Sequence, residues 1–215
     1  MSERGRPRKF DRDLALRRAM AVFRERGYDA ASIGELTAAM GINSPSLYAA
    51  FGCKEALFRE ALELYVATDG ATTERALADA PSAREAVDAM LRGAALGFTA
   101  ERPGRGCLVV LGATHRTPEN EAVYDDLVAR RCRTLEQIRR RLKRGIDEGD
   151  VPPGADVAAV AAFYSTVLNG LSLQVRDGAT RKRLLAVVDC AMAAWDRLVG
   201  EAHPPARRAR EASVR

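Results

Sequence analysis

The chain has 215 residues, of which 47% are hydrophobic and 29% are charged, and this balance excludes a chain that is disordered throughout. The formal net charge of +5 is small, so basic residues can indicate a nucleic-acid partner only where they cluster. The four cysteines stand far apart, which excludes a disulfide framework or a zinc knuckle and is typical of a reducing compartment. We therefore expect a cytoplasmic protein without a metal or other cofactor.

Helical patterns recur along the chain, strand patterns are weak, and alanine, a strong helix former, is plentiful. These features predict an all-α fold of about nine helices. Residues 1–10 form a basic arm, and a first helix is expected over residues 11–26. Ser32 stands three residues before Glu35, which is the spacing of a capping box, and Gly41 is placed to end the helix that this box begins.

The next helix is expected to be very short. Ser44 is a good N-cap, and Pro45 stands at the first helical position, where its missing N–H costs nothing. Leu47 and Phe51, four residues apart, are expected to face the core, and a fourth helix begins near Lys54. A helix of this length adds little to a core, but it suits a narrow groove.

The second half is also predicted to be helical. The sequence DGATT at residues 69–73 suggests a fraying helix end and a junction, and Thr117 with the following proline suggests a helix start. Helices are expected over residues 82–100, 117–146, 156–176 and 180–200, with a short apolar segment at 107–113. The predicted domains are residues 11–65 and 66–200, followed by a disordered tail at 201–215.

Residues 157–175 carry no charge, so a membrane helix has to be considered. Polar residues such as Ser165 and Asn169 interrupt this segment, which is also short for a bilayer, and a buried helix is the better interpretation. No membrane partner is expected. The basic run at residues 130–144 alternates with an apolar stripe, which favours a solvated outer helix face over a second nucleic-acid surface.

Short helices joined by tight turns match a helix-turn-helix module, in which the second helix of the pair enters the DNA major groove. The sequence ASIGELTAAMGINSPSLYAAFGCKEALFREALELY resembles the DNA-binding domain of the TetR (tetracycline-repressor-like) family of bacterial transcriptional regulators. The resemblance covers about residues 10–65, and its most specific residues are Leu47, Tyr48, Phe51, Lys54, Glu55 and Leu57. It implies a regulator, usually a repressor, whose second helical domain forms a dimer and houses a ligand pocket.

The sequence departs from the family pattern at two positions. Many relatives have a histidine where this chain has Ala50 and an asparagine where it has Cys53. Ala50 removes one possible phosphate contact, so Tyr48 and Lys54 are expected to carry more of the anchoring to DNA.

The candidate DNA-binding residues lie in the arm and in the module. The arm sequence RGRPRK resembles an AT-hook core, whose arginines enter a narrow minor groove, and a solvated basic tail is the alternative. In the module, small residues let the helix backbone approach base edges, while Tyr48 and Lys54 can reach phosphates. The predicted set is Arg6, Arg8, Lys9, Ser32, Thr37, Ser44, Pro45, Ser46, Tyr48 and Lys54.

The second domain is expected to bind a small, mostly apolar effector. Cys107 follows the sequence GRG near Arg105, a setting that favours a reactive thiolate, so oxidation or an electrophile is a second possible trigger. The alternative for this cysteine is a small buried hydrophobe. The candidate pocket residues are Met90, Phe98, Cys107, Leu108, Tyr124, Phe163 and Tyr164.

The last two helices are apolar on two sides, so each must be buried on two sides. One side is expected to face the domain itself and the other a partner chain, as the family resemblance also implies; a thick monomeric core is the alternative. The candidate dimer residues are Val167, Gly170, Leu171, Val188, Met192 and Trp195. A dimer would bind a near-palindromic double-stranded operator.

Two other classes of function have weaker support. An enzyme is not expected, because the chain has only two histidines and no Gly-rich phosphate loop, nucleophile elbow or metal-ligand cluster. A non-specific architectural DNA-binding protein would need a larger basic surface than the net charge of +5 offers, and it is kept as the alternative to a regulator.

Overall fold

The computed structural model describes residues 11–100 and 105–200, which form eleven α-helices and one π-helical turn and contain no strand. The all-α prediction is confirmed. Two helices, α5 and α11, were not expected; α11 is separate because Ala194 interrupts the helix predicted over residues 180–200. The elements are α1 (Arg12–Ala30), α2 (Ile33–Met40), α3 (Ser44–Phe51), α4 (Lys54–Tyr65), η1 (Val66–Gly70), α5 (Ala71–Asp79), α6 (Ala83–Phe98), α7 (Leu108–Leu111), α8 (Glu121–Glu148), α9 (Val157–Arg176), α10 (Arg181–Ala193) and α11 (Trp195–Gly200).

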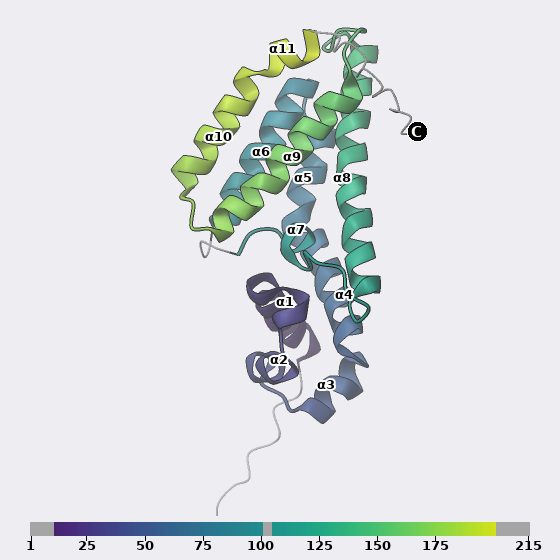
Figure 1. Ribbon diagram of the computed structural model, residues 1–215, viewed down its shortest axis with the longest axis vertical. Coiled ribbons are helices and arrows are strands. Elements are labelled where there is room, and N and C mark those ends of the chain that lie inside the picture. Colours follow the sequence, from purple (N-terminus) through teal and green to yellow (C-terminus); the bar gives the residue numbers. More distant parts are fainter. Residues whose placement is uncertain (1–10, 101–104, 201–215) are drawn as a thin grey trace, which may run out of the picture.

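The helices form two groups along the long axis of the molecule (Figure 1). α1, α2 and α3 lie at the lower end, and α6, α8, α9 and α10 pack together at the upper end. α4, η1 and α5 link the two groups as a nearly continuous helix, because Tyr65, Val66 and Ala71 all keep right-handed helical backbone angles. The fraying end predicted at residues 69–73 is therefore wrong: a π-helical turn absorbs the irregular sequence, and the chain stays helical to Asp79.

Each group has its own hydrophobic core. The lower core, formed by the buried side chains of α1 to α4, also includes Leu108 and Leu127, which come from the second half of the chain. The upper core forms around Met90, Tyr164 and Trp195, which are at most 3% exposed. The second half of the sequence therefore completes the core of the first half.

The two groups meet where the end of α1 contacts the turn after α7. The Tyr28 N–H donates to the Gly112 carbonyl over 2.6 Å. Gly27, which ends the regular part of α1 as the sequence suggests, has φ 77° and ψ 175°, a conformation that only glycine adopts readily. A Cβ atom at Gly27 would lie 3.1 Å from the Gly112 carbonyl oxygen, so the close approach also requires a glycine.

The long helix α8 starts later than predicted. It begins at Glu121 after Asn120, and not after Thr117, because the Asn120 side chain accepts the Thr117 N–H over 2.9 Å and closes a turn there. The Asn120 amide also donates to both carboxylate oxygens of Asp29, each over 3.0 Å. Asn120 is 1% exposed, so it fixes the start of α8 against the end of α1.

α9 is long and apolar enough to cross a membrane by length and composition alone. Its residues Val160, Tyr164, Leu168 and Leu171 are buried in the upper core. α9 is therefore a helix of the protein core, in agreement with the interpretation from the sequence.

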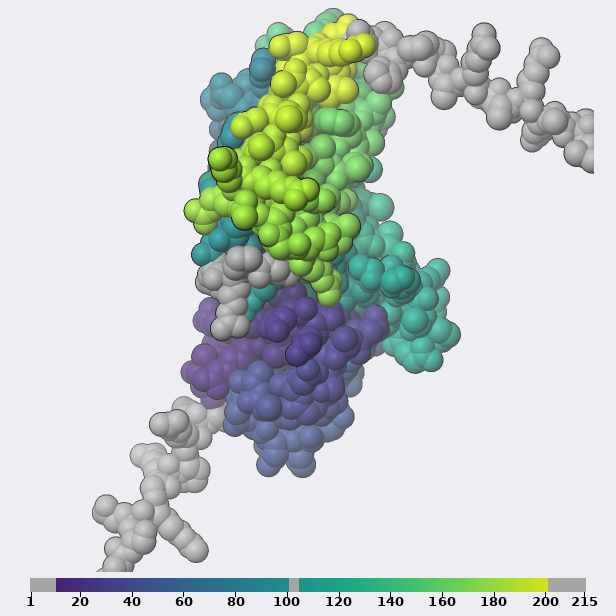
Figure 2. Space-filling view, turned by 60° about the vertical axis from the view of Figure 1, so that its left-hand side comes forward, coloured from purple at the N-terminus to yellow at the C-terminus, as the bar shows by residue number. Residues whose placement is uncertain are grey.

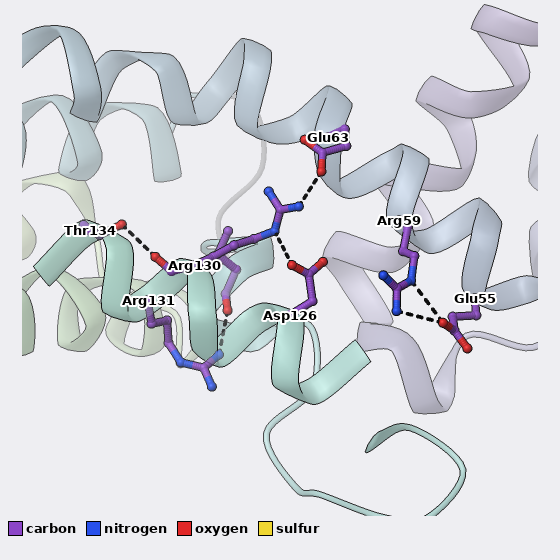
Figure 3. A network of polar contacts seen from close by, with 8 residues as sticks. Glu55, Arg59, Glu63, Asp126, Arg130, Arg131 and Thr134 are labelled. Atoms are coloured by element: carbon purple, nitrogen blue, oxygen red, sulfur yellow. Dashed lines mark hydrogen bonds and ion pairs between the residues drawn. The ribbon is translucent and has the colours of Figure 1, made fainter. Parts of the chain in front are cut away.

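The basic run at residues 130–144 is a charge-paired helix face. Figure 3 shows the Arg130 guanidinium between Asp126 of α8, at 3.1 Å, and Glu63 of α4. Two further arginines of the run share the carboxylate of Glu136. This pairing favours the outer-face interpretation over a second nucleic-acid surface, and Arg130 additionally ties α4 to α8.

Replacing Gly27 should weaken the junction between the two cores. Gly27→Ala is expected to lower the free energy of unfolding by about 1–3 kcal/mol, because alanine is strained at this backbone conformation. Gly97→Ala is the control, since Gly97 is helical and an added Cβ there meets nothing within 4 Å. Denaturant titrations at one protein concentration measure both; equal stability of the two variants would contradict the role given to Gly27.

Candidate functional site

The start of α3 is capped one residue earlier than predicted. Asn43, not Ser44, is the N-cap: it has extended backbone angles, and its side-chain oxygen accepts the Ser46 N–H over 2.9 Å. Ser44 and Pro45 are the first two helical residues. A backbone N–H at this position has no hydrogen-bond partner within the helix, so its absence from proline costs nothing. The cap fixes the direction in which α3 leaves the preceding turn.

The two faces of α3 are separated as the sequence predicts. Leu47 and Phe51 are buried in the lower core, whereas Pro45, Ser46 and Tyr48 are exposed, with 48% of Tyr48 accessible. α3 lies at the lower end of the molecule (Figure 1), and the blue surface that includes its residues forms the lower tip in Figure 2. Its leading turn is therefore free to meet a large partner.

A shallow groove beside α3 contains two residues that the sequence reasoning missed. Asn43 lines it together with Arg12, the first residue of α1. The Arg12 guanidinium lies 4.4 Å from the Phe51 ring centroid and donates to the Ala50 carbonyl and to Glu60. Its position directly after the basic arm was the available signal for Arg12; for Asn43 it was the strong capping preference of asparagine.

The predicted residues of α2 differ in accessibility. Ser32 is exposed and forms the capping box with Glu35, whose side chain accepts the Ser32 N–H over 3.0 Å. The hydrogen bonds from Ser32 lower the pKa of the Glu35 carboxyl, which favours the charged carboxylate in the capping box. Thr37 is only 8% exposed, and its hydroxyl donates to the Ile33 carbonyl over 2.8 Å. Thr37 thus faces the lower core, so little of its side chain is accessible to DNA.

Lys54 is engaged within the protein. Its ammonium lies 3.4 Å from the Asp29 carbonyl oxygen and 4.6 Å from the ring centroid of Tyr28, and burial lowers its pKa. Lys54 therefore holds the start of α4 against the end of α1. The neighbouring Cys53 caps α4, since its sulfur accepts the Ala56 N–H over 3.4 Å. The predicted arm residues Arg6, Arg8 and Lys9 lie outside the described residues.

A cavity of about 630 Å³ lies at the junction of the two groups of helices. Of the predicted pocket residues only Phe98 and Cys107 line it. The other five predicted residues do not line this cavity, because a helical stripe identifies buried residues without distinguishing core from cavity. Met90 and Tyr164 are buried in the upper core, Leu108 and Tyr124 pack in the lower core, and Phe163 is 37% exposed.

The cavity wall combines polar and apolar groups. Tyr65, the last residue of α4, and Cys107 both line it. Burial, followed by the interaction with Cys107, raises the pKa of the Tyr65 phenol well above its usual value, so it stays neutral. The backbone N–H of Cys107 donates to the Ser172 hydroxyl of α9 over 2.8 Å. Cys107 therefore lies between the end of α4 and α9.

Most of the residues predicted for the dimer interface are buried inside the protomer. Periodicity shows two apolar sides on a helix, but it does not show which one faces the protomer's own core. Gly170 is exposed and Val167 half-buried, whereas Leu171, Val188, Met192 and Trp195 are all buried in the upper core. The exposed large apolar residues of α9 and α10 are Phe163, Leu173 and Val187.

Comparison with known proteins gives concordant matches. Residues 15–61 match the model of the bacterial regulatory proteins of the tetR family. The HTH-type transcriptional repressor ComR of Escherichia coli (strain K12) is 32% identical over 197 residues, 91% of this chain and 94% of that protein. The HTH-type transcriptional repressor BdcR of the same organism is 34% identical over 188 residues, 87% of this chain and 90% of that protein.

A solved structure extends this similarity to a complex with DNA. A cysteine-substituted variant of the TetR family transcriptional regulator CifR, bound to a 26-base-pair operator, is 53% identical and has a TM-score of 0.84. The match covers 88% of this chain and all of that chain. The helical groups described above therefore correspond to a fold that is known to bind operator DNA.

Removing the cap of α3 should weaken both the helix and its binding to DNA. Asn43→Ala is expected to lower the free energy of unfolding by about 1 kcal/mol, since the Ser46 N–H loses its partner. Asn43→Ser retains a capping oxygen and serves as the matched control. Chemical denaturation and anisotropy titrations with duplex DNA measure the two effects; if the alanine and serine variants behave alike, the capping role is wrong.

Proposed function

The chain belongs to the TetR family of bacterial regulatory proteins, and from that premise we propose that it is a cytoplasmic, ligand-responsive transcriptional repressor that binds a palindromic operator as a homodimer. The observation that supports this most strongly is the capped, exposed leading turn of α3. In this proposal residues 11–65 bind DNA and residues 66–200 bind the effector and the partner chain, while residues 107–127 of the second part brace the first. A non-specific architectural DNA-binding protein is the alternative.

In the proposed complex α3 enters the major groove and α2 crosses the phosphate backbone beside it. Ser44, Pro45 and Ser46 bring the helix backbone close to base edges, while the exposed Tyr48 hydroxyl reaches a phosphate. Lys54, held against α1, orients the N-terminal amides of α4 toward another phosphate. The arm residues Arg6, Arg8 and Lys9 would contact the adjacent minor groove.

The proposed dimer interface is the outer face of α9 with the adjoining part of α10. This α9 face carries Ala162, Thr166, Gly170 and Leu173, all exposed and uncharged, and Val187 of α10 extends it. Gly170 meets no neighbouring atom within 4 Å of an added Cβ, so it permits close approach of a second helix. A homodimer is typical of the family, and it places two α3 helices on one face of a duplex.

The proposed effector site is the cavity at the junction, because a ligand there touches both groups of helices. It is lined by α1 of the DNA-binding part through Met20 and by α6 and α9 of the second part through Phe98 and Leu168. A ligand that favours one arrangement of these helices changes the separation of the two α3 helices in the dimer. DNA then weakens ligand binding by the same factor.

Chemical modification of Cys107 is a second proposed trigger. This half-buried thiol lines the effector cavity, where a small electrophile or oxidant can reach it. Tyr65 at the end of α4 lies beside Cys107, whose backbone N–H donates to Ser172 of α9. An adduct on the sulfur would push these two elements apart.

Selection of bound duplexes from a random pool, using the purified full chain, tests the proposed function. The recovered sequences should contain a near-palindrome, and footprinting should show protection limited to it. Equal affinity for the recovered duplex and for a scrambled duplex of the same composition would favour the architectural alternative.

A charge on the outer face of α9 should separate the dimer. Leu173→Glu is expected to change the mass measured by light scattering from twice 23.3 kDa to 23.3 kDa, because an unpaired carboxylate would be buried in the interface. Leu14→Glu is the control, since Leu14 is a comparably exposed residue of α1. A Leu173→Glu variant that stays dimeric would exclude this face.

The Cys107 proposal predicts that Cys107→Ser retains operator binding and loses release by hydrogen peroxide or by a small alkylating agent. The exposed Cys190 supplies the control variant Cys190→Ser, which should respond as the natural chain does. Anisotropy titrations before and after treatment provide the readout. Unchanged release from the Cys107→Ser variant would dispose of this trigger.

A further inference from the structure

The effector cavity is richer in positive charge than an apolar ligand requires. Two carboxylate side chains line it, against a larger number of guanidinium groups contributed by α1, by the segment before α7 and by α8. Even with Glu63 and Asp126, which pair with Arg130 from outside the lining, the arginines at the cavity outnumber the carboxylates, and this favours an anion over a neutral or cationic ligand of the same shape. The six arginines are Arg17, Arg24, Arg105, Arg130, Arg131 and Arg133.

Arg24 of α1 is the arginine best placed to bind an anion. Its side chain is 10% exposed, and one terminal nitrogen donates to Asp69 over 2.7 Å. The guanidinium lies 5.1 Å from the ring centroid of Tyr65, and its other terminal nitrogen is 3.5 Å from the Gly106 carbonyl oxygen. These contacts hold the guanidinium at the cavity wall before a ligand binds.

The Arg24 Nε–H has no hydrogen-bond partner among the residues that the structure describes, although it is buried. A buried donor of a charged group without a partner costs free energy, and an acceptor oxygen from a ligand would remove that cost. An anionic oxygen is the strongest such acceptor, because charge-assisted hydrogen bonds are stronger than neutral ones.

The rest of the cavity suits an apolar body. Five different elements, α1, η1, α6, α7 and α9, contribute apolar side chains to its wall. These are Met20, Val66, Phe98, Val109 and Leu168. A cavity of about 630 Å³ has the size of sites that hold a drug-sized ligand. The wall therefore combines a fixed cationic group with apolar surface that is large enough for an aromatic ring or a short aliphatic chain.

We propose that the effector is an amphipathic organic anion, whose carboxylate or sulfonate group binds Arg24 while its apolar body packs against Phe98 and Leu168. This rests on the proposed function, in which the same cavity is the effector site. An anion at Arg24 competes with Asp69 of η1 for the same guanidinium and so loosens the contact between α1 and η1.

Two fluorescent probes that differ in one anionic group test the ligand class. The full chain is titrated with 8-anilinonaphthalene-1-sulfonate (ANS) and with N-phenyl-1-naphthylamine (NPN), which lacks the sulfonate. ANS is expected to bind with a Kd about tenfold or more below that of NPN, as one charge-assisted contact would give. Equal affinities, or tighter binding of NPN, would overturn the proposal.

Arginine variants locate the site. Arg24→Gln should raise the Kd for ANS about tenfold and leave that for NPN within about twofold, because only the sulfonate loses a contact. Arg59→Gln removes an exposed arginine of α4 that does not line the cavity, and it should change neither value. If Arg24→Gln does not fold, Arg24→Lys, which lacks the Nε–H donor, takes its place and should also raise the Kd for ANS. If the Arg24 variant that folds still binds ANS more tightly than NPN by the same factor as the natural chain, the site is also refuted.

Operator titrations in saturating ANS separate this inference from the proposed function. Reduced operator affinity, absent in the Arg24→Gln variant, supports both. Arg24-dependent ANS binding with unchanged operator affinity would leave the anion site standing and refute the cavity as an effector site.

Discussion

The contact between the end of α1 and the turn after α7 is the constraint on which the arrangement of the molecule depends. The Tyr28 N–H reaches the Gly112 carbonyl over 2.6 Å only because Gly27 has no side chain and adopts a backbone angle closed to other residues. Asn120 and Lys54 both bind Asp29, one from the start of α8 and the other from the start of α4. The end of α1 is thus fixed from three sides, and it joins the lower core to the upper one.

In the proposed function, this junction couples the cavity to the DNA-binding surface. Arg24 lines the cavity less than one helical turn before Gly27, and Lys54 orients the helix that follows α3. A ligand at Arg24 and a duplex at α3 therefore act on opposite ends of one packed unit. Because packed interfaces shift between discrete arrangements, a small displacement of α1 would be enough to move α3 relative to the second copy of the proposed dimer.

The sequence predicted those features that depend on neighbours within about one helical turn. The capping box at Ser32 and the inward side of Leu47 are of this kind. It could not predict which apolar side of α9, α10 and α11 faces inward, so Leu171 and Trp195, which it assigns to the dimer interface, lie in the upper core. It also missed the cavity lining, since a residue such as Arg24 looks like any solvated helix arginine until tertiary packing buries it.

Hydrogen exchange at the junction, measured on the full chain with and without a saturating operator duplex, is the most direct test of this coupling. If DNA binding is transmitted through the contact of α1 with the turn after α7, operator should slow exchange of the Tyr28 amide and of residues 105–113, as well as of α2 and α3. Slowing that is confined to α2, α3 and the start of α4 would contradict the account.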